Sequence, residues 1–77
     1  MWKEVENNLV KTFEFKNFIE AFGFMTKVAL LAQQADHHPW WNNVYNKVEI
    51  KLTTHSEGNK ITDKDKKLAA AIDKLYI

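Results

Sequence analysis

The chain has 77 residues and a formal net charge of +1 at pH 7, which allows one small domain, residues 1–77. All 11 basic residues are lysines, so a nucleic-acid site is not expected, and the absence of cysteine excludes disulfides and thiolate chemistry. No apolar stretch resembles a signal peptide or a membrane span, so we expect a cytoplasmic protein with no membrane partner.

The N-terminal segment is predicted to form an antiparallel hairpin. Trp2 to Glu6 and Leu9 to Phe15 are typical of extended chain, and Asn7-Asn8 between them is the expected turn. In the second strand Leu9, Lys11 and Phe13 are expected to share one face.

A helix is predicted next, because the apolar period changes from two to about 3.6 residues. Asn17 and Glu20 have the spacing of a capping box, and the pattern runs for about 18 residues to Gln34 or Ala35. Gly23 inside this helix would be tolerable where the backbone passes close to the sheet. The expected buried stripe consists of Phe18, Ile19, Phe22, Met25, Val28, Ala29, Leu31 and Ala32.

The segment from Trp41 to Thr54 is predicted to be extended. Asn46 is the single polar residue on its apolar face, so the segment is either one strand or a short strand near Val44 and a longer one from Val48 to Thr54. The side chains expected on the buried face are Val44, Asn46, Val48, Ile50 and Leu52.

A loop over residues 56–60 and a second helix complete the chain. Thr62 and Asp65 have the spacing of a capping box at the start of this helix. The apolar stripe expected to face the core consists of Leu68, Ala71, Ile72 and Leu75.

All three histidines are predicted to lie at the ends of elements. Pro39 discourages His38 from remaining helical, so His37 and His38 follow the first helix, and His55 follows the extended segment. Imidazole changes protonation near neutral pH, so these groups with a carboxylate at Asp36 or Asp65 would suffice for proton transfer. The neighbouring aromatic residues Trp40, Trp41 and Tyr45 could stack on a flat heterocycle.

Two other interpretations of the histidines compete with proton transfer. A zinc site is not expected, because adjacent histidines seldom converge on one ion. Alternatively, His37 and His38 interact with the dipole at the helix end, His55 is a surface residue, and Asp65 only satisfies backbone donors at the start of a helix. The spacing alone leaves this interpretation and a catalytic role open.

A series of motifs occurs in a defined order: Ala35-Asp36-His37-His38-Pro39, Trp41, Asn43-Val44-Tyr45-Asn46-Lys47-Val48, Ile50, Leu52, Thr54-His55, Ile61-Thr62 and Asp65. This order closely resembles the pterin-4a-carbinolamine dehydratases, and the resemblance extends from Trp2 to the last helix.

The resemblance implies an α+β fold in which a four-stranded antiparallel sheet has helices packed on one face, and it implies homodimers or homotetramers. The implied reaction is dehydration of 4a-hydroxytetrahydropterin to quinonoid dihydropterin, with no metal and no organic cofactor. This step recycles tetrahydrobiopterin for an aromatic amino acid hydroxylase. The alternative is a pterin-binding or dimerisation module of the same fold that acts as a transcriptional coactivator.

The resemblance also implies the site residues. His37, His38, His55 and Asp65 would be catalytic. Our hypothesis is that His38 and His55 divide the acid and base roles, while His37 mainly binds and polarises the pterin. The residues implied to contact the substrate are Asp36, Pro39, Trp41, Thr54, Ser56 and Glu57.

Two departures from the family pattern are evident. The family usually has an additional helix before the position of Trp2, and the sequence shows no counterpart of it. We therefore expect an oligomer partner to cover the part of one sheet face that this helix would otherwise bury. The family glycine usually precedes the Ile-Thr step directly, whereas Asn59 and Lys60 intervene after Gly58 here, so the loop is expected to be altered.

Overall fold

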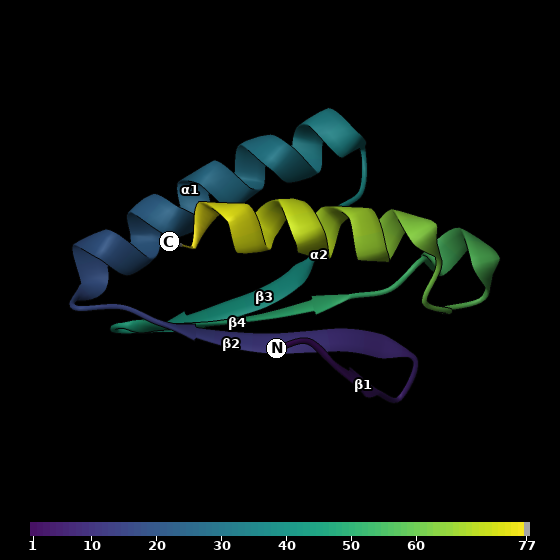
Figure 1. Ribbon diagram of the computed structural model, residues 1–77, viewed down its shortest axis with the longest axis horizontal. Helices are drawn as coiled ribbons and strands as arrows, with labels where there is room; N and C mark the ends of the chain where they lie inside the picture. The colour runs from purple at the N-terminus through teal and green to yellow at the C-terminus, as the bar shows by residue number, and fades with distance from the viewer. Residues whose placement is uncertain (77) are drawn as a thin grey trace.

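The computed structural model describes residues 1–76, in which a four-stranded antiparallel sheet carries two helices on one face (Figure 1). The spatial order of the strands is β1-β2-β4-β3. The predicted α+β fold is therefore confirmed. The elements are β1 (Lys3–Val5), β2 (Asn8–Glu14), α1 (Phe18–Ala35), β3 (Trp40–Val44), β4 (Lys47–Leu52), a short 3-10 helix η1 (His55–Glu57) and α2 (Asp63–Leu75).

The β1–β2 hairpin forms as predicted, but its turn lies one residue earlier than expected. Glu6 and Asn7 have φ values of 49° and 65°, and Val5 pairs with Asn8. A two-residue turn with both φ values positive matches the right-handed twist of the flanking strands. Asn8 therefore begins β2 and is not part of the turn.

The extended segment after α1 is a second hairpin, which confirms the two-strand alternative. Tyr45 adopts a left-handed φ of 51°, and Val44 pairs with Lys47. Asn46 anchors this turn, because its side-chain amide donates to the Phe15 carbonyl while its own carbonyl accepts from the Phe15 N–H. Since the turn interrupts the alternation, Val44 is exposed, and its predicted burial was wrong.

The core lies between the sheet and the two helices. Phe13 is fully buried, and its ring centroid lies 4.9 Å from that of Phe24 and 5.0 Å from that of Tyr76. The buried apolar residues of this cluster are Leu9, Phe13, Ala21, Phe24, Val28, Val48, Ile50, Leu52, Leu68, Ala69 and Ile72.

Helix α1 has the predicted bounds, and the Asn17 side chain caps it by accepting from the Glu20 N–H at 2.9 Å. The predicted stripe was wrong in part, because Ile19 is 77% exposed and Phe22 54% exposed. Two neighbouring rows of this helix are apolar, and periodicity does not distinguish them. The row that packs has small alanines near both ends, which allow close approach: Ala21, Phe24, Val28 and Ala32.

The position of Gly23 also differs from the expectation. Gly23 is exposed, and no atom beyond the adjoining helical backbone lies within 4 Å of where a Cβ would stand. The expected close approach to the sheet is therefore absent at this residue. No steric reason for glycine appears in the described part of the chain.

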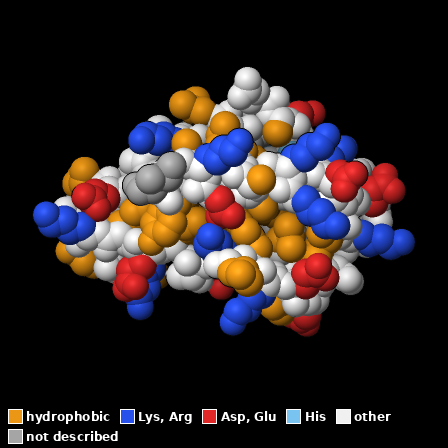
Figure 2. Space-filling view, viewed as in Figure 1, with side chains coloured by type: hydrophobic (Ala, Val, Ile, Leu, Met, Phe, Trp, Pro, Cys, Tyr) orange, Lys and Arg blue, Asp and Glu red, His pale blue; other side chains and the backbone are white. Residues whose placement is uncertain are grey.

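Helix α2 begins with the predicted capping box, in which Thr62 and Asp65 satisfy each other's backbone N–H groups. Its buried row contains Leu68, Ala69 and Ile72, while Ala71 and Leu75 are half-buried at its sides. Neither helix described in residues 1–76 is long and apolar enough to cross a membrane. On the face viewed in Figure 2, lysine and acidic side chains are interspersed and form no single-sign patch.

Candidate active site

The end of α1 sets the positions of the paired histidines. Asp36 adopts a left-handed conformation (φ 51°, ψ 44°), and the His37 N–H donates to the Ala32 carbonyl at 3.0 Å. Together with the bond from the Asp36 N–H to the Gln33 carbonyl, this is a Schellman motif. The chain leaves the helix abruptly, and both histidines lie just beyond the last turn, as Pro39 predicts.

His37 and Asp65 form a buried pair. The Nε2 atom of His37 lies 2.5 Å from Oδ1 of Asp65, and the two side chains are 11% and 0% exposed. The second carboxylate oxygen, Oδ2, accepts from the Thr54 hydroxyl at 2.7 Å and from the Thr62 N–H at 2.8 Å. Asp65 therefore joins the end of α1, the residue after β4 and the start of α2.

The environment of Asp65 stabilises its ionised form. Burial by itself raises the pKa of the carboxyl, but the hydrogen bonds from the Thr62 backbone, His37 and Thr54 outweigh this effect. The pKa of Asp65 is accordingly held below its ordinary value. The side chain thus combines the predicted capping role with a direct contact to one of the predicted histidines.

His38 and His55 lie in a different place from His37. Both line a groove with a volume of about 330 Å³, together with Asn8, Trp40, Lys51 and Thr53. Side chains alternate along a strand, and Lys51 lies between the core residues Ile50 and Leu52. The groove therefore opens on the side of the sheet that faces away from the helices.

Hydrogen bonds orient both rings in this groove. Nδ1 of His55 lies 2.7 Å from the Asn59 side-chain oxygen, and Nε2 of His38 lies 3.0 Å from the Gln33 side-chain oxygen. Because these amide oxygens only accept, the bonded nitrogens carry the protons. Nε2 of His55 and Nδ1 of His38 are then left with lone pairs when the rings are neutral.

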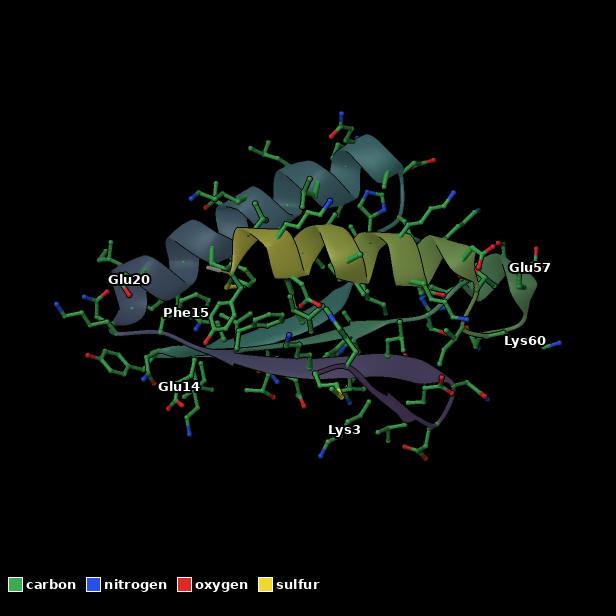
Figure 3. All side chains as sticks on the ribbon, viewed as in Figure 1. Lys3, Glu14, Phe15, Glu20, Glu57 and Lys60 are labelled. Atoms are coloured by element: carbon green, nitrogen blue, oxygen red, sulfur yellow. The ribbon has the colours of Figure 1, made fainter. Side chains whose placement is uncertain are left out.

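The altered loop supplies the residue that orients His55. After η1, Gly58 and Asn59 both have left-handed φ values, of 77° and 60°. Thr54 and Lys60 close the loop with a hydrogen bond of 2.9 Å from the Thr54 N–H to the Lys60 carbonyl. The expected departure from the family pattern thus places the Asn59 side chain against His55. Figure 3 shows Glu57 and Lys60 at this end of the molecule.

His37 borders a second groove, which lies between the two helices. It has a volume of about 320 Å³ and is lined by Leu31, Gln34, Ala35, His37, Lys64, Lys67, Leu68 and Ala71. The structure therefore brings His38 and His55 to one groove but does not bring His37 to the same lining. His37 and His38 are adjacent in sequence but line different grooves.

The remaining predicted site residues fall into three groups by exposure. Ser56 and Glu57 are exposed on η1 beside His55, and Asp36 is exposed at the end of α1. Thr54, by contrast, is 2% exposed and donates to Asp65. Pro39 and Trp41 are half-buried, and Trp41 packs against the core.

Sequence reasoning did not assign three lining residues of the His38 groove: Asn8, Lys51 and Thr53. Trp40 was considered only as a stacking surface for a ring. The pairing of β3 with β4 places Trp40 directly opposite Lys51, so recognition of this hairpin would have brought the two residues together. Asn8 belongs to another strand, and no local signal connects it to the histidines.

Comparison with known proteins identifies relatives over nearly the whole chain. A family model described as pterin 4 alpha carbinolamine dehydratase matches residues 1–75. A protein of Prochlorococcus marinus (strain NATL2A), provisionally named a pterin-4-alpha-carbinolamine dehydratase, is 61% identical over 74 residues, which are 96% of this chain and 77% of that protein. A protein of Rhizobium rhizogenes (strain K84 / ATCC BAA-868) with the same provisional name is 54% identical over 67 residues, 87% of this chain and 65% of its own.

Two solved structures have the same architecture. The crystal structure of a transcriptional coactivator/pterin dehydratase from Brucella melitensis has a TM-score of 0.94 and 42% identity, and the match covers 99% of this chain and 82% of that one. A pterin dehydratase-like protein identified as a RuBisCO assembly factor in the alpha-carboxysome has a TM-score of 0.83 and 24% identity, covering 97% of this chain and 88% of its own. The likeness to this second structure concerns the fold alone.

Proposed function

The chain belongs to the pterin 4 alpha carbinolamine dehydratase family, and we propose that it converts 4a-hydroxytetrahydropterin to quinonoid dihydropterin and water. The proposal includes no metal and no organic cofactor, and an aromatic amino acid hydroxylase would supply the substrate. The single observation that carries it is the groove shared by His38 and His55. Its volume of about 330 Å³ is at the lower end of the range for small-molecule sites, which suits a bicyclic ring.

The chemistry requires one proton donor and one proton acceptor. The bond between carbon 4a and its hydroxyl oxygen breaks as a proton reaches that oxygen, while a ring nitrogen loses a proton to form the new double bond. An imidazolium can perform the first step and a neutral imidazole the second. We assign these two roles to His38 and His55, because their unbonded ring nitrogens belong to side chains of one groove.

His37 and Asp65 have a positioning role in this proposal. The family resemblance implies that His37 lies beside the pterin, but its contact with Asp65 and its separate groove support a structural contribution. Asp65 also holds Thr54, which directly precedes His55 in the chain. One buried carboxylate therefore fixes the backbone next to both proposed catalytic histidines.

The substrate-binding residues are assigned by exposure. Ser56 and Glu57 remain candidates for direct contact because they are exposed beside His55. Asp36 is also exposed, although its backbone N–H already donates to carbonyl groups at the end of α1. Thr54 acts through Asp65, and Pro39 and Trp41 shape the chain that carries His38.

We also propose that the protein is a homo-oligomer. Helix α1 exposes a second apolar row in which the Phe18 and Phe22 ring centroids lie 5.8 Å apart, with Ile19 beside them. Contiguous exposed apolar surface of this kind is typical of interaction sites. A second copy of the chain would bury it.

Single replacement of the proposed catalytic histidines tests the function. We expect His38→Ala and His55→Ala each to lower the turnover of 4a-hydroxytetrahydropterin by about 10²- to 10⁴-fold, the usual contribution of a positioned acid or base. Lys60→Ala, an exposed residue of the loop after η1 that lies outside the groove lining, is the matched control. Circular dichroism checks that all variants fold, and unchanged turnover in both histidine variants would contradict the proposal.

A second candidate function is a non-catalytic module that binds pterin or regulates transcription. It is favoured by the description of the Brucella melitensis relative as both a coactivator and a dehydratase. Fluorescence titration with an oxidised pterin separates the two candidates when combined with turnover. Binding without turnover would support the module, whereas binding with turnover would support the enzyme.

A further inference from the structure

Lys51 occupies an unusual position in the groove of His38 and His55. Its Nζ atom lies 4.6 Å from the ring centroid of Trp40, the residue directly opposite on β3. This cation–π contact holds the ammonium group within the groove lining. In residues 1–76 the ion pairs join Lys11 to Asp73 and His37 to Asp65, so Lys51 has no carboxylate partner.

The rest of the groove lining is complementary to negative charge. Its six residues are Asn8, His38, Trp40, Lys51, Thr53 and His55, and none of them carries a carboxylate. Lys51 adds a full positive charge, and the Asn8 side-chain amide, which uses one N–H on the Glu6 carbonyl, has a second N–H to donate. A cleft with one sign of charge raises the local concentration of ligands of the opposite charge.

We propose that Lys51 makes this groove selective for pterins whose side chain ends in an anionic group, either a carboxylate or a phosphate. The inference rests on the proposed function, because it assumes that the pterin ring lies beside His38 and His55. An ammonium group on a flexible stem can leave the indole face to form a charge-assisted hydrogen bond with the anion. Trp40 keeps that stem at the groove in the unliganded protein.

Three oxidised pterins test the inference by fluorescence titration: 6-hydroxymethylpterin, 6-carboxypterin and the phosphate ester of 6-hydroxymethylpterin. We expect at least one anionic pterin to bind about 5- to 10-fold more tightly than the neutral one at low salt. The anionic pterin with the larger gain in affinity over 6-hydroxymethylpterin shows whether the groove prefers a carboxylate or a phosphate. Lys51→Met should reduce the ratio between the affinities for the anionic and the neutral pterin to about one.

Lys47→Met is the matched control. Lys47 lies on the same strand and the same side of the sheet as Lys51, but it is exposed and outside the groove lining. The preference for the anionic pterin should survive this change. A charge effect of the whole surface would instead reduce the preference equally in both variants, and that result would overturn the inference.

Three further results would also overturn the inference. Equal affinity for all three pterins, in a protein that dehydrates 4a-hydroxytetrahydropterin, would contradict the role of Lys51 and leave the proposed function intact. Failure to bind any of the pterins, together with no turnover, would contradict both. If folded Lys51→Met still binds an anionic pterin more tightly than the neutral one, other residues cause the selectivity and the proposed role of Lys51 is refuted.

Discussion

The carboxylate of Asp65 lies fully buried at 2.5 Å from Nε2 of His37. Its other oxygen accepts from Thr54 and Thr62, so every hydrogen-bonding group around it is a donor. An amide in place of the carboxylate would direct its own N–H group toward one of these donors. The network therefore requires an acceptor at both oxygens.

Asp65→Asn is accordingly expected to destabilise the fold by about 2–4 kcal/mol, because buried donors lose their partner. The loss should appear in urea unfolding followed by circular dichroism. Asp63→Asn is the control, since Asp63 is an exposed acidic residue in the same first turn of α2. Equal loss in the two variants would show that the effect belongs to the helix dipole and not to the buried network.

The lowered pKa of Asp65 predicts a specific dependence of stability on pH. The folded protein favours the ionised carboxyl more than the unfolded chain does, where its pKa is about 3.9. This contribution is fully present above the unfolded pKa and is lost as the pH falls through the folded pKa. Urea unfolding between about pH 5 and pH 2 should show falling stability, with a smaller slope in Asp65→Asn.

Replacement of Asn59 is expected to lower activity without lowering the stability of the fold. Its oxygen orients the His55 ring, and its φ of 60° is a conformation that glycine adopts without strain. Asn59→Gly should therefore keep the fold while turnover decreases on the order of 10-fold. Asn59→Asp retains an acceptor and should retain most activity. Equal turnover in wild type and Asn59→Gly would show that the hydrogen bond does not contribute.

The two glycines predict stability changes of opposite sign. Gly23 lies in the exposed interior of α1 with open space around the Cβ position, so Gly23→Ala should stabilise the fold by about 0.5–1 kcal/mol. Gly58 has a φ of 77°, where a side chain is strained, so Gly58→Ala should destabilise it by about 1–2 kcal/mol. Thermal unfolding of both variants tests this pair. A lower midpoint for Gly23→Ala would point to a close contact that the described residues do not contain.

The exposed row of α1 predicts a change in association. Phe22→Glu should shift the protein toward the monomer, because it places a charge in the proposed contact between copies. Sedimentation analysis over a range of concentrations measures the shift. Ala70→Glu places the same charge on an exposed position of α2 and should leave the mass unchanged. A single-chain mass for the wild type would contradict the proposed oligomer.

Local patterns were sufficient to predict most of the fold. The alternation around Leu9 and Phe13, the cap at Asn17 and the capping box at Thr62 each depend on residues close in sequence, and all three were confirmed. The buried face of α1 was not predictable in the same way, because two apolar rows compete and tertiary packing selects between them. The first turn was displaced because Glu6 adopts a left-handed conformation that its residue type does not favour.

The site was predictable only in part for the same physical reason. Helix termination at Pro39 placed His38 near the edge of the sheet, and the end of β4 did the same for His55. The separation of His37 from His38 depends on the fold around Asp65. The resemblance grouped Asp65 with all three histidines and did not pair it with His37. The contributions of Asn8 and Lys51 depend on strand pairing across the sheet, which no local motif reveals.

The contacts of α2 also make the site sensitive to partial unfolding. Asp73 accepts hydrogen bonds from Trp2 and Lys11, at sequence separations of 71 and 62 residues, while Asp65 in the same helix holds His37 and Thr54. If α2 detached, these long-range bonds would break together while the hairpins kept their local hydrogen bonds. Amide hydrogen exchange in α2 should therefore report how often the folded protein transiently loses the contacts of Asp65 with His37 and Thr54.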